Sequence, residues 1–123
     1  MTQEEKELLI KDLCARLPYG VKINENTQGD FTVIGLTMER VFTTCETEGC
    51  HNDFPVECVK PYLFPLSSMT EEQEKEYNNL NCYELGCFPH SEEALDYLTK
   101  NHFDYRYLIE KGLAIDATSL NIY

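Results

Sequence analysis

The sequence predicts a single α+β domain over residues 1–123, and three features of the chain predict it. A helix-capping signal and an amphipathic pattern open the chain, short alternating segments of apolar and polar residues follow, and capping signals recur in the second half. We therefore expect an N-terminal amphipathic helix, a small three-stranded antiparallel meander and a helical C-terminal half. A length of 123 residues matches one ordinary domain.

The first predicted element is a helix that begins after Thr2. Thr2 and Glu5 have the spacing of a capping box, in which the two side chains bond reciprocally to backbone N–H groups. Apolar residues then recur at three- and four-residue spacing and form one stripe that should face a core: Leu9, Ile10, Leu13, Cys14 and Leu17. Pro18 and Gly20 end this helix.

Three short segments predict the meander. Residues 21–24 alternate apolar and polar side chains, and residues 24–30 are typical of a turn. Residues 31–37 are rich in β-branched and apolar side chains, and residues 41–44 form a further short run after a polar break. Because these segments are short and closely spaced, antiparallel pairing between neighbours is expected.

The middle of the chain is first polar and then rich in proline. Residues 45–53 contain little apolar surface, which predicts an exposed loop. Residues 55–59 fit one helical turn, since proline is tolerated at the first helical position. The prolines of residues 61–66 then predict an irregular, extended brace.

Capping signals divide the second half into helices. Residues 70–80 predict a charged surface helix, residues 82–90 predict a loop, and residues 91–101 predict a helix with an apolar inward side. Asp104 is placed to cap a short fourth helix. Residues 113–123 are expected to form an extended tail or an edge strand.

The charge of the chain limits the classes of partner. It has 22 acidic and 10 basic residues, for a formal net charge of −12. Because no cluster of Lys or Arg is present to neutralise phosphates, direct nucleic-acid binding is disfavoured. The opening residues are polar and acidic, unlike a secretory signal, and no apolar run approaches the length of a membrane span. We therefore expect a cytoplasmic protein that does not enter a membrane.

Six cysteines raise the question of a metal site or disulfides. Without a secretory signal, free thiols are expected. Cys45, Cys50 and His51, with Cys58 nearby, are the candidate metal ligands, and residues 82–90 hold further cysteines and a histidine that would complete a tetrahedral site. The cysteine spacing is not the short paired spacing of structural zinc, so we expect unliganded cysteines, no metal and no cofactor.

A chemically diverse group of side chains follows the predicted third helix. His102, Asp104, Tyr105 and Arg106 bring together an imidazole, a carboxylate, a phenol and a guanidinium, a composition suited to recognition. Each of the last three also has a structural interpretation, as a helix cap, a core residue and an ion-pair partner. Tyr62 belongs to an excess of aromatic residues that cannot all fit a small core, and it completes the set of candidate binding residues.

Four segments of the sequence are distinctive: Leu13–Gly20, Lys60–Thr70, Asn101–Arg106 and Leu108–Ala114. Taken together, they resemble a family of short, uncharacterised proteins of gut Bacteroides and of their phages and mobile elements, and the resemblance covers most of the chain. It implies no established activity, cofactor or catalytic residue. The chain departs from the family pattern in a shorter connection over residues 81–91 and in a different end after residue 114.

The expected function is a non-enzymatic protein-interaction or regulatory module with a protein partner, which the resemblance associates with phages or mobile elements. Catalysis by the adjacent Cys50 and His51 is disfavoured, because sequence neighbours seldom point at one another. Dispersed glycines give no phosphate-binding loop. Two alternatives stay open: an acidic nucleic-acid mimic that occupies a basic protein groove through the acids of residues 71–76 and 92–96, and a small zinc-binding domain.

Overall fold

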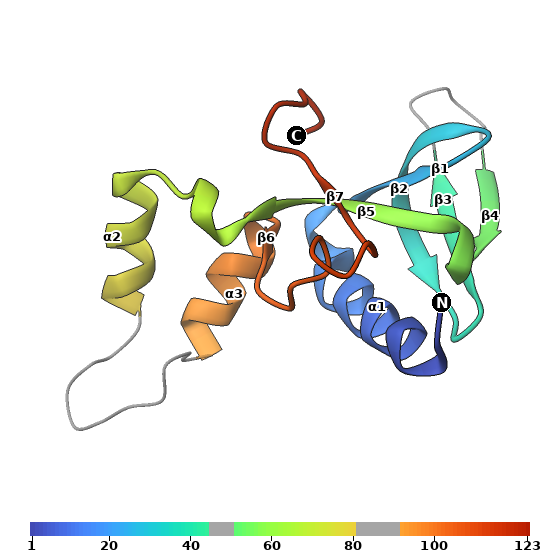
Figure 1. Cartoon of the computed structure of the whole chain (residues 1–123), viewed down its shortest axis with the longest axis horizontal. Coiled ribbons are helices and arrows are strands. Elements are labelled where there is room, and N and C mark those ends of the chain that lie inside the picture. Colours follow the sequence, from blue (N-terminus) through green and yellow to red (C-terminus); the bar gives the residue numbers. More distant parts are fainter. Residues whose placement is uncertain (45–50, 81–91) are drawn as a thin grey trace.

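The computed structural model describes residues 1–44, 51–80 and 92–123. These residues form three α-helices, α1 (Gln3–Arg16), α2 (Glu71–Leu80) and α3 (Glu92–Lys100), and three single-turn 3-10 helices. The strands are β1 (Lys22–Glu25), β2 (Gly29–Leu36), β3 (Arg40–Thr44), β4 (His51–Pro55), β5 (Val59–Pro65), β6 (Phe103–Asp104) and β7 (Ile115–Asp116). They form one sheet in the order β4-β3-β2-β1-β5-β6, with β7 also paired to β5. α1 lies beside the sheet, and α2 and α3 lie beyond the far end of β5 (Figure 1).

The predicted architecture is wrong. Over the described residues the sheet has seven strands where the sequence predicts a three-stranded meander, and the second half contributes β5, β6 and β7 to it in addition to α2 and α3. β6 and β7 contain two residues each, too few to show the alternation by which a strand is recognised. The predicted loop over residues 82–90 lies outside the described residues.

α1 begins where the sequence predicts. The N–H of Glu5 donates to the Thr2 hydroxyl at 3.1 Å, and the N–H of Thr2 donates to the Glu5 carboxylate at 3.0 Å, so the capping box is complete. Leu9 and Leu13 of the predicted stripe are fully buried, whereas Cys14 is exposed. The buried stripe of α1 is therefore narrower than its apolar residues suggest.

β1, β2 and β3 form the predicted antiparallel meander, and β4 adds a strand at its edge. Alternate residues of β2 are buried, Phe31 and Val33 among them. The predicted exposed loop is wrong over its last residues, because residues 51–53 belong to β4; residues 45–50 lie outside the described part of the chain. As an edge strand with a solvent-facing side, β4 tolerates the polar residues that suggest a loop.

β5 connects the meander to the second half of the chain. Its first residues pair antiparallel with β1, with Pro61 opposite Ile23. Further along, Tyr62–Leu63 pair in parallel with β7, and Phe64–Pro65 pair in parallel with β6. The predicted irregular brace is therefore a regular strand. Its prolines suggest irregular structure because each removes a backbone donor, but a proline does not prevent an extended backbone.

α2 and α3 correspond to the predicted helices of the second half, but the predicted fourth helix is wrong. Thr70 and Gln73 cap α2 reciprocally, with bonds of 3.2 Å to the Thr hydroxyl and 2.9 Å to the Gln side-chain oxygen. After β6 the chain forms turns, in which the Asp104 carboxylate accepts from the N–H groups of Leu108 and Ile109. Asp104 thus caps a turn that does not continue as a helix. Within the described ranges, no helix is long and apolar enough to cross a membrane.

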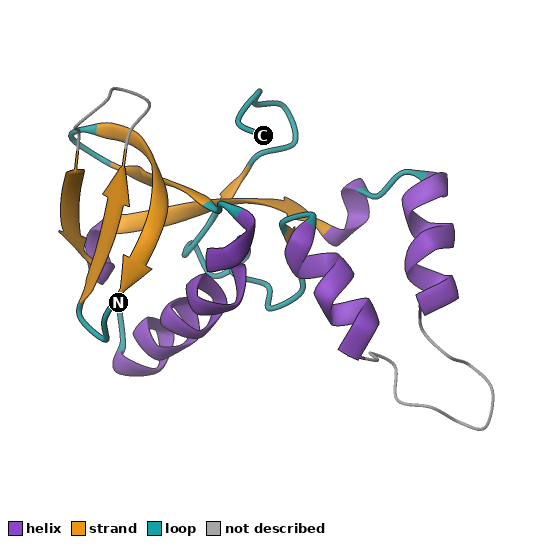
Figure 2. Cartoon of the chain, turned by 180° about the vertical axis from the view of Figure 1, so that it is seen from behind, coloured by secondary structure: helices purple, strands orange, loops and turns teal. Residues whose placement is uncertain are grey.

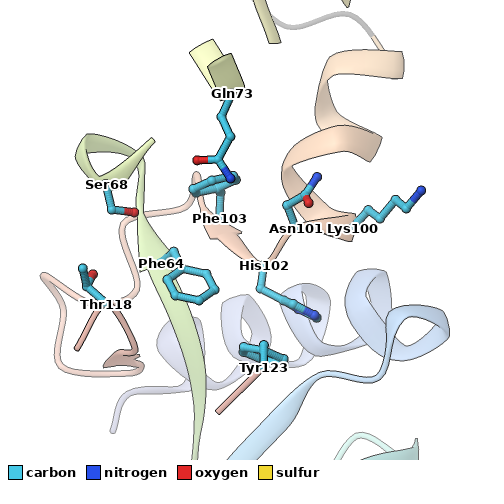
Figure 3. Close-up of a pocket in the computed structure, with 9 residues that line it drawn as sticks. All are labelled: Phe64, Ser68, Gln73, Lys100, Asn101, His102, Phe103, Thr118 and Tyr123. Atoms are coloured by element: carbon cyan, nitrogen blue, oxygen red, sulfur yellow. The ribbon is translucent and has the colours of Figure 1, made fainter. Parts of the chain in front are cut away.

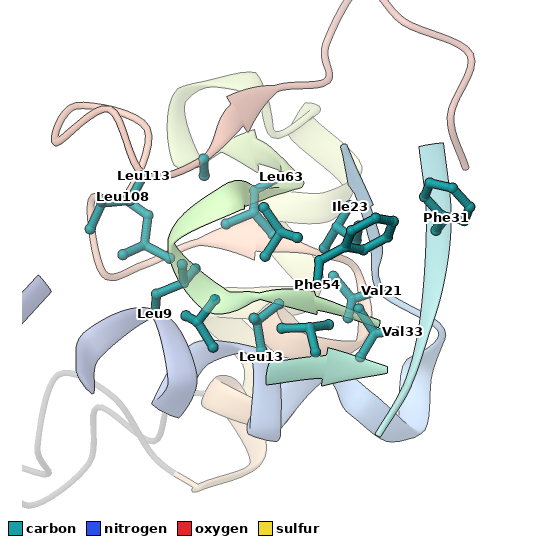
Figure 4. Close-up of a cluster of buried hydrophobic side chains, with 14 residues drawn as sticks. Leu9, Leu13, Val21, Ile23, Phe31, Val33, Phe54, Leu63, Leu108 and Leu113 are labelled. Atoms are coloured by element: carbon teal, nitrogen blue, oxygen red, sulfur yellow. The ribbon is translucent and has the colours of Figure 1, made fainter. Parts of the chain in front are cut away.

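Figure 2 shows α1 packed beside the sheet, and the hydrophobic core lies between them (Figure 4). Its buried members are Leu9, Leu13, Val21, Ile23, Phe31, Val33, Val41, Phe54, Val56, Val59, Leu63, Leu108, Leu113 and Ala114. Leu63 of β5 and Leu108 of the following turns are fully buried among them. Burial of one leucine side chain contributes roughly 1.5–3 kcal/mol to stability. Because these two leucines pack in the same core as the residues of the meander, they anchor the second half of the chain to it.

Candidate functional site

A pocket of about 400 Å³ lies where β5, α2, the end of α3 and the segment after β7 meet (Figure 3). It is lined by Phe64, Ser68, Gln73, Lys100, Asn101, His102, Phe103, Thr118 and Tyr123. None of these residues is acidic, although the chain has 22 acidic residues. A pocket of this size can hold a small molecule or a large side chain.

Aromatic rings form one side of the pocket. The ring of Tyr123 stacks on that of His102, with centroids 3.9 Å apart and an interplanar angle of 13°. The ring centroid of Phe64 lies 5.9 Å from that of Tyr123 and 6.2 Å from that of Phe103, and both pairs of ring planes are tilted. Stacked and tilted arrangements at these distances are favourable for aromatic pairs. The pocket therefore offers ring surfaces to the flat or apolar part of a ligand.

His102 follows α3 in an unusual backbone conformation. Its φ of 62° is a left-handed value that glycine usually supplies after a helix. Its N–H donates to the carbonyl of Thr99 at 3.1 Å, and its carbonyl accepts from the N–H of Phe64 at 2.8 Å. His102 thus connects the end of α3 to β5. Non-glycine residues held in this conformation store strain and cluster at functional sites.

The imidazole of His102 is buried and lacks a hydrogen bond on one nitrogen. The residue is 7% exposed, and its Nδ1 has no partner among the described residues. Burial, reinforced by the positive charge of Arg16, lowers the pKa of His102 to about 4. The ring is therefore neutral near pH 7, and a bound group that paired with Nδ1 would be favoured, because unpaired buried polar atoms are costly.

Tyr123 bridges two strands beside the pocket. Its hydroxyl accepts from the N–H of Lys22 at 2.9 Å and donates to the carbonyl of Tyr62 at 2.8 Å. Continued by one residue, the β1–β5 register would place Lys22 opposite Tyr62, so the hydroxyl takes the place of a direct backbone hydrogen bond. Burial raises the pKa of Tyr123 to about 12, which keeps the hydroxyl protonated and able to donate.

The polar residues of the pocket use only part of their hydrogen-bonding capacity. Asn101 donates through Nδ2 to the carbonyl of Tyr97 at 2.9 Å, and Gln73 accepts through Oε1 from Thr70 at 2.9 Å. Among the described residues, Asn101 Oδ1 and Gln73 Nε2 have no other partner, and the exposed Lys100 makes no ion pair. The pocket thus presents an acceptor, a donor and a positive charge.

The structure separates the residues that the sequence predicts to bind. His102 lines the pocket. Tyr62 contributes its carbonyl to the Tyr123 bridge, while its side chain is buried and donates to the carboxylate of Asp30. Asp104 is buried and bonded to backbone N–H groups. Of these three, only His102 has a side chain in the pocket.

Tyr105 and Arg106 are half-buried and contact instead the buried charges of α1. Arg106 donates to Asp12 at 2.8 Å, and Asp12 also pairs with Arg16 at 2.8 Å. The Arg106 guanidinium carbon lies 4.5 Å from the centroid of the Tyr105 ring, within the range of a cation–π contact. Arg16 also donates to the carbonyl of Phe103 at 2.5 Å. Asp12, Arg16 and Arg106, here named the buried ion cluster, join α1 to the β6 segment.

The candidate metal ligands are only partly described. Cys45 and Cys50 lie outside the described residues, and His51 is described only in its backbone, as part of β4. Cys58 is exposed and has a free thiol. Among the residues that the structure describes, no group of three His, Cys, Asp or Glu side chains is arranged to hold a metal.

Sequence reasoning missed several residues of the site. Lys100, Asn101 and Tyr123 carry no local signal, because the pocket forms from segments that are distant in the chain. Asp12 and Arg16 do have the i, i+4 spacing of a helical ion pair. That spacing is usually found on exposed helix faces, so it does not predict that both side chains are fully buried.

Comparisons with protein-family models, with curated proteins and with solved structures found no match. The chemistry of the site is therefore inferred from its geometry. The hydroxyl of Ser68 donates to the carbonyl of Pro65 at 2.6 Å, so its proton is engaged by the backbone. The ring surfaces, the amides of Gln73 and Asn101 and the ammonium of Lys100 are groups of the kind that contact ligands in pockets.

Proposed function

We propose that the chain is a non-enzymatic binding module that recognises another protein through the pocket around His102. The observation that carries this proposal is Nδ1 of His102, the one buried side-chain polar atom without a partner among the described residues. His102 lines a pocket with ring surfaces and with polar groups that are not fully used. Protein interfaces commonly concentrate their binding energy where a large side chain of one partner fills such a pocket.

The charge of the chain supports a partner with a basic surface around the inserted side chain. At a net charge of −12, long-range attraction would speed the encounter with such a partner. The acids of α2 give less support to a nucleic-acid mimic, because Glu71, Glu72 and Glu74 lie in the first turn of the helix. In that position they interact favourably with the helix dipole, which accounts for them without a partner.

Two matched substitutions test the proposal. Thr118 lines the pocket and is exposed, so Thr118→Trp should place an indole over the opening; Ser119 is exposed and does not line the pocket. Proteins captured from a lysate would be quantified by mass spectrometry, and their affinities measured by calorimetry. We expect Thr118→Trp to weaken the specific partner at least about 10-fold, or ~1.4 kcal/mol, and Ser119→Trp to leave its affinity within about 2-fold.

Equal capture by both variants would contradict a binding site at the pocket. Native mass spectrometry of the purified chain adds a second readout. A small molecule that co-purifies with the wild type and is lost from Thr118→Trp would show that the pocket serves a metabolite rather than a protein.

A further inference from the structure

Tyr123 is 45% exposed, yet both its ring and its hydroxyl have partners. Its ring stacks on His102 at 3.9 Å and lies 5.9 Å from Phe64. Its hydroxyl receives one hydrogen bond, from Lys22 N–H, and makes one, to Tyr62 C=O. These four groups are named here the tyrosine slot, and Figure 3 shows Tyr123 below the His102 ring within it.

The N–H of Lys22 and the carbonyl of Tyr62 make the slot specific for a side chain with a hydroxyl. Residues of a strand point their N–H and C=O alternately to opposite neighbours, and Val21 faces β2 through its bond from Val33 N–H at 3.0 Å. Lys22 therefore faces β5, where its N–H and the carbonyl of Tyr62 are joined only through the inserted hydroxyl. A phenylalanine in the slot would keep the ring contacts but would leave both groups without this bridge.

Two side chains hold the segment after Ala117: Thr118 is bonded to the neighbouring Asp116, and Tyr123 joins the residues beyond Thr118 to the rest of the protein. The N–H of Ala117 donates to Leu63 at 2.9 Å, which ends the pairing with β5. Beyond it, the hydrogen bonds and ring contacts of residues 118–123 with the described residues before 116 are all made by Tyr123. Figures 1 and 2 both show this segment projecting away from the sheet and helices. Residues 119–123 can therefore leave while the core stays intact.

We propose that the partner presents a tyrosine to this slot, and that Tyr123 occupies the slot until the partner's tyrosine replaces it. The inference rests on the proposed function and names the chemistry of the partner. Thr118 stays beside the pocket during this exchange, because its N–H and hydroxyl donate to the carboxylate of Asp116 in β7, so the exchange releases residues 119–123 and frees the slot. The segment thereby acts as a built-in competitor for the partner.

The test compares two small probes that differ by one hydroxyl, N-acetyl-tyrosinamide and N-acetyl-phenylalaninamide. Each is titrated into the wild type, Tyr123→Ala and the control Leu120→Ala, an exposed position in the same segment. NMR signals of the His102 ring and the Lys22 amide report binding. We expect Tyr123→Ala to bind the tyrosine probe about 10-fold more tightly than the phenylalanine probe, because only the former restores both hydrogen bonds. The wild type and Leu120→Ala should bind both probes at least about 10-fold more weakly.

A fold-preserving variant keeps the test decisive. Tyr123→Phe retains the ring contacts, so the tyrosine probe should displace it more readily than it displaces Tyr123. Equal affinity of Tyr123→Ala for the two probes, or equal affinity of the wild type and Tyr123→Ala for the tyrosine probe, would overturn the inference. If either result is found while Thr118→Trp still abolishes partner capture, the tyrosine exchange is wrong and the proposed function stands. If Thr118→Trp leaves partner capture unchanged, the proposed function itself is wrong.

Discussion

The buried ion cluster and the pocket meet at one short stretch of chain, residues 99–103, and differ in how their polar groups are paired. Arg16 donates to the carbonyls of Thr99 and Phe103 and to Asp12, which accepts from Arg106 as well. His102, between those two carbonyls in sequence, faces a different environment, with its Nδ1 unpaired among the described residues. One region is closed by its own side chains, and the other has groups that a ligand can pair.

This difference in pairing indicates that the buried ion cluster positions the chain and that the pocket is the part able to bind a ligand. The buried ion cluster fixes the end of α3 against α1, because a displacement of either would leave charges buried without partners. His102 is held in place by that arrangement, and its side chain can then keep an incompletely paired nitrogen next to the pocket. The cluster therefore supplies rigidity, and the pocket supplies capacity to bind.

The strongest way to break this arrangement is to remove the acid of the cluster. Asp12→Ala leaves Arg16 fully buried without its carboxylate partner, which should lower the free energy of unfolding by about 3–5 kcal/mol. Urea unfolding followed by circular dichroism measures the loss. Lys11→Ala, an exposed neighbour on the same helix, is the control and should change stability by less than about 0.5 kcal/mol. A similar small loss for Asp12→Ala would mean that the cluster does not hold the segment.

The second prediction concerns pH and His102. Its pKa is about 4 in the folded protein against 6.5 in the unfolded chain, so between these values the unfolded chain binds the extra proton. The free energy of unfolding should therefore fall as the pH is lowered from about 6.5 towards 4, by at most about 1.4 kcal/mol per pH unit. The contribution of His102 is fully present above that window.

His102→Asn isolates this contribution, because asparagine tolerates the left-handed backbone and does not titrate. The difference in unfolding free energy between wild type and variant should shrink by about 2 kcal/mol between pH 7 and pH 4.5. Urea unfolding at both pH values measures it. A difference that stays constant across this range would show that the imidazole is not protected from protonation.

The third prediction tests how firmly Tyr123 is held. Tyr123→Phe removes the hydroxyl that joins Lys22 and Tyr62, and we expect it to cost about 1 kcal/mol. The loss should be local: hydrogen exchange should accelerate at the Lys22 amide and leave the amide of Leu63 in the core unchanged. Tyr107→Phe is the control, because the hydroxyl of this exposed residue makes no hydrogen bond with the described residues. Faster exchange throughout the sheet would contradict a separately anchored segment.

The parts of the fold that the sequence predicts are those with local signals. The capping box at Thr2 and Glu5 places the start of α1, and the alternation around Ile23 and Val33 identifies β1 and β2. Capping boxes and alternation each depend on residues a few positions apart, so they can be read before the tertiary structure is known. This explains why the meander and the three helices are recognisable in the sequence.

The remaining features depend on contacts between distant residues. β6 and β7 are strands only because β5 lies beside them, and the prolines of β5 suggest irregular structure. At the site, the chemistry of His102 is visible in the sequence, but its stacking on Tyr123 is not. Asp104 and Arg106 are also chemically suited to binding, but their side chains are already bonded within the protein, Asp104 to a backbone N–H and Arg106 to Asp12. Composition thus predicts which side chains can bind, and only tertiary pairing decides which of them are free to do so.

The smallest expected effect compares two residues with the same backbone conformation. Tyr107 has a φ of 59°, close to the 62° of His102, but it is 56% exposed and contributes little packing. Asparagine adopts this conformation more readily than tyrosine, so Tyr107→Asn should raise the free energy of unfolding by about 0.5 kcal/mol. At neutral pH, His102→Asn should lower it, because the buried ring contacts with Tyr123 are lost. Thermal unfolding of both variants measures the two signs. A stabilising effect at both positions would mean that the stacked ring of His102 contributes less than its backbone strain costs, and that the pocket owes its shape to other residues.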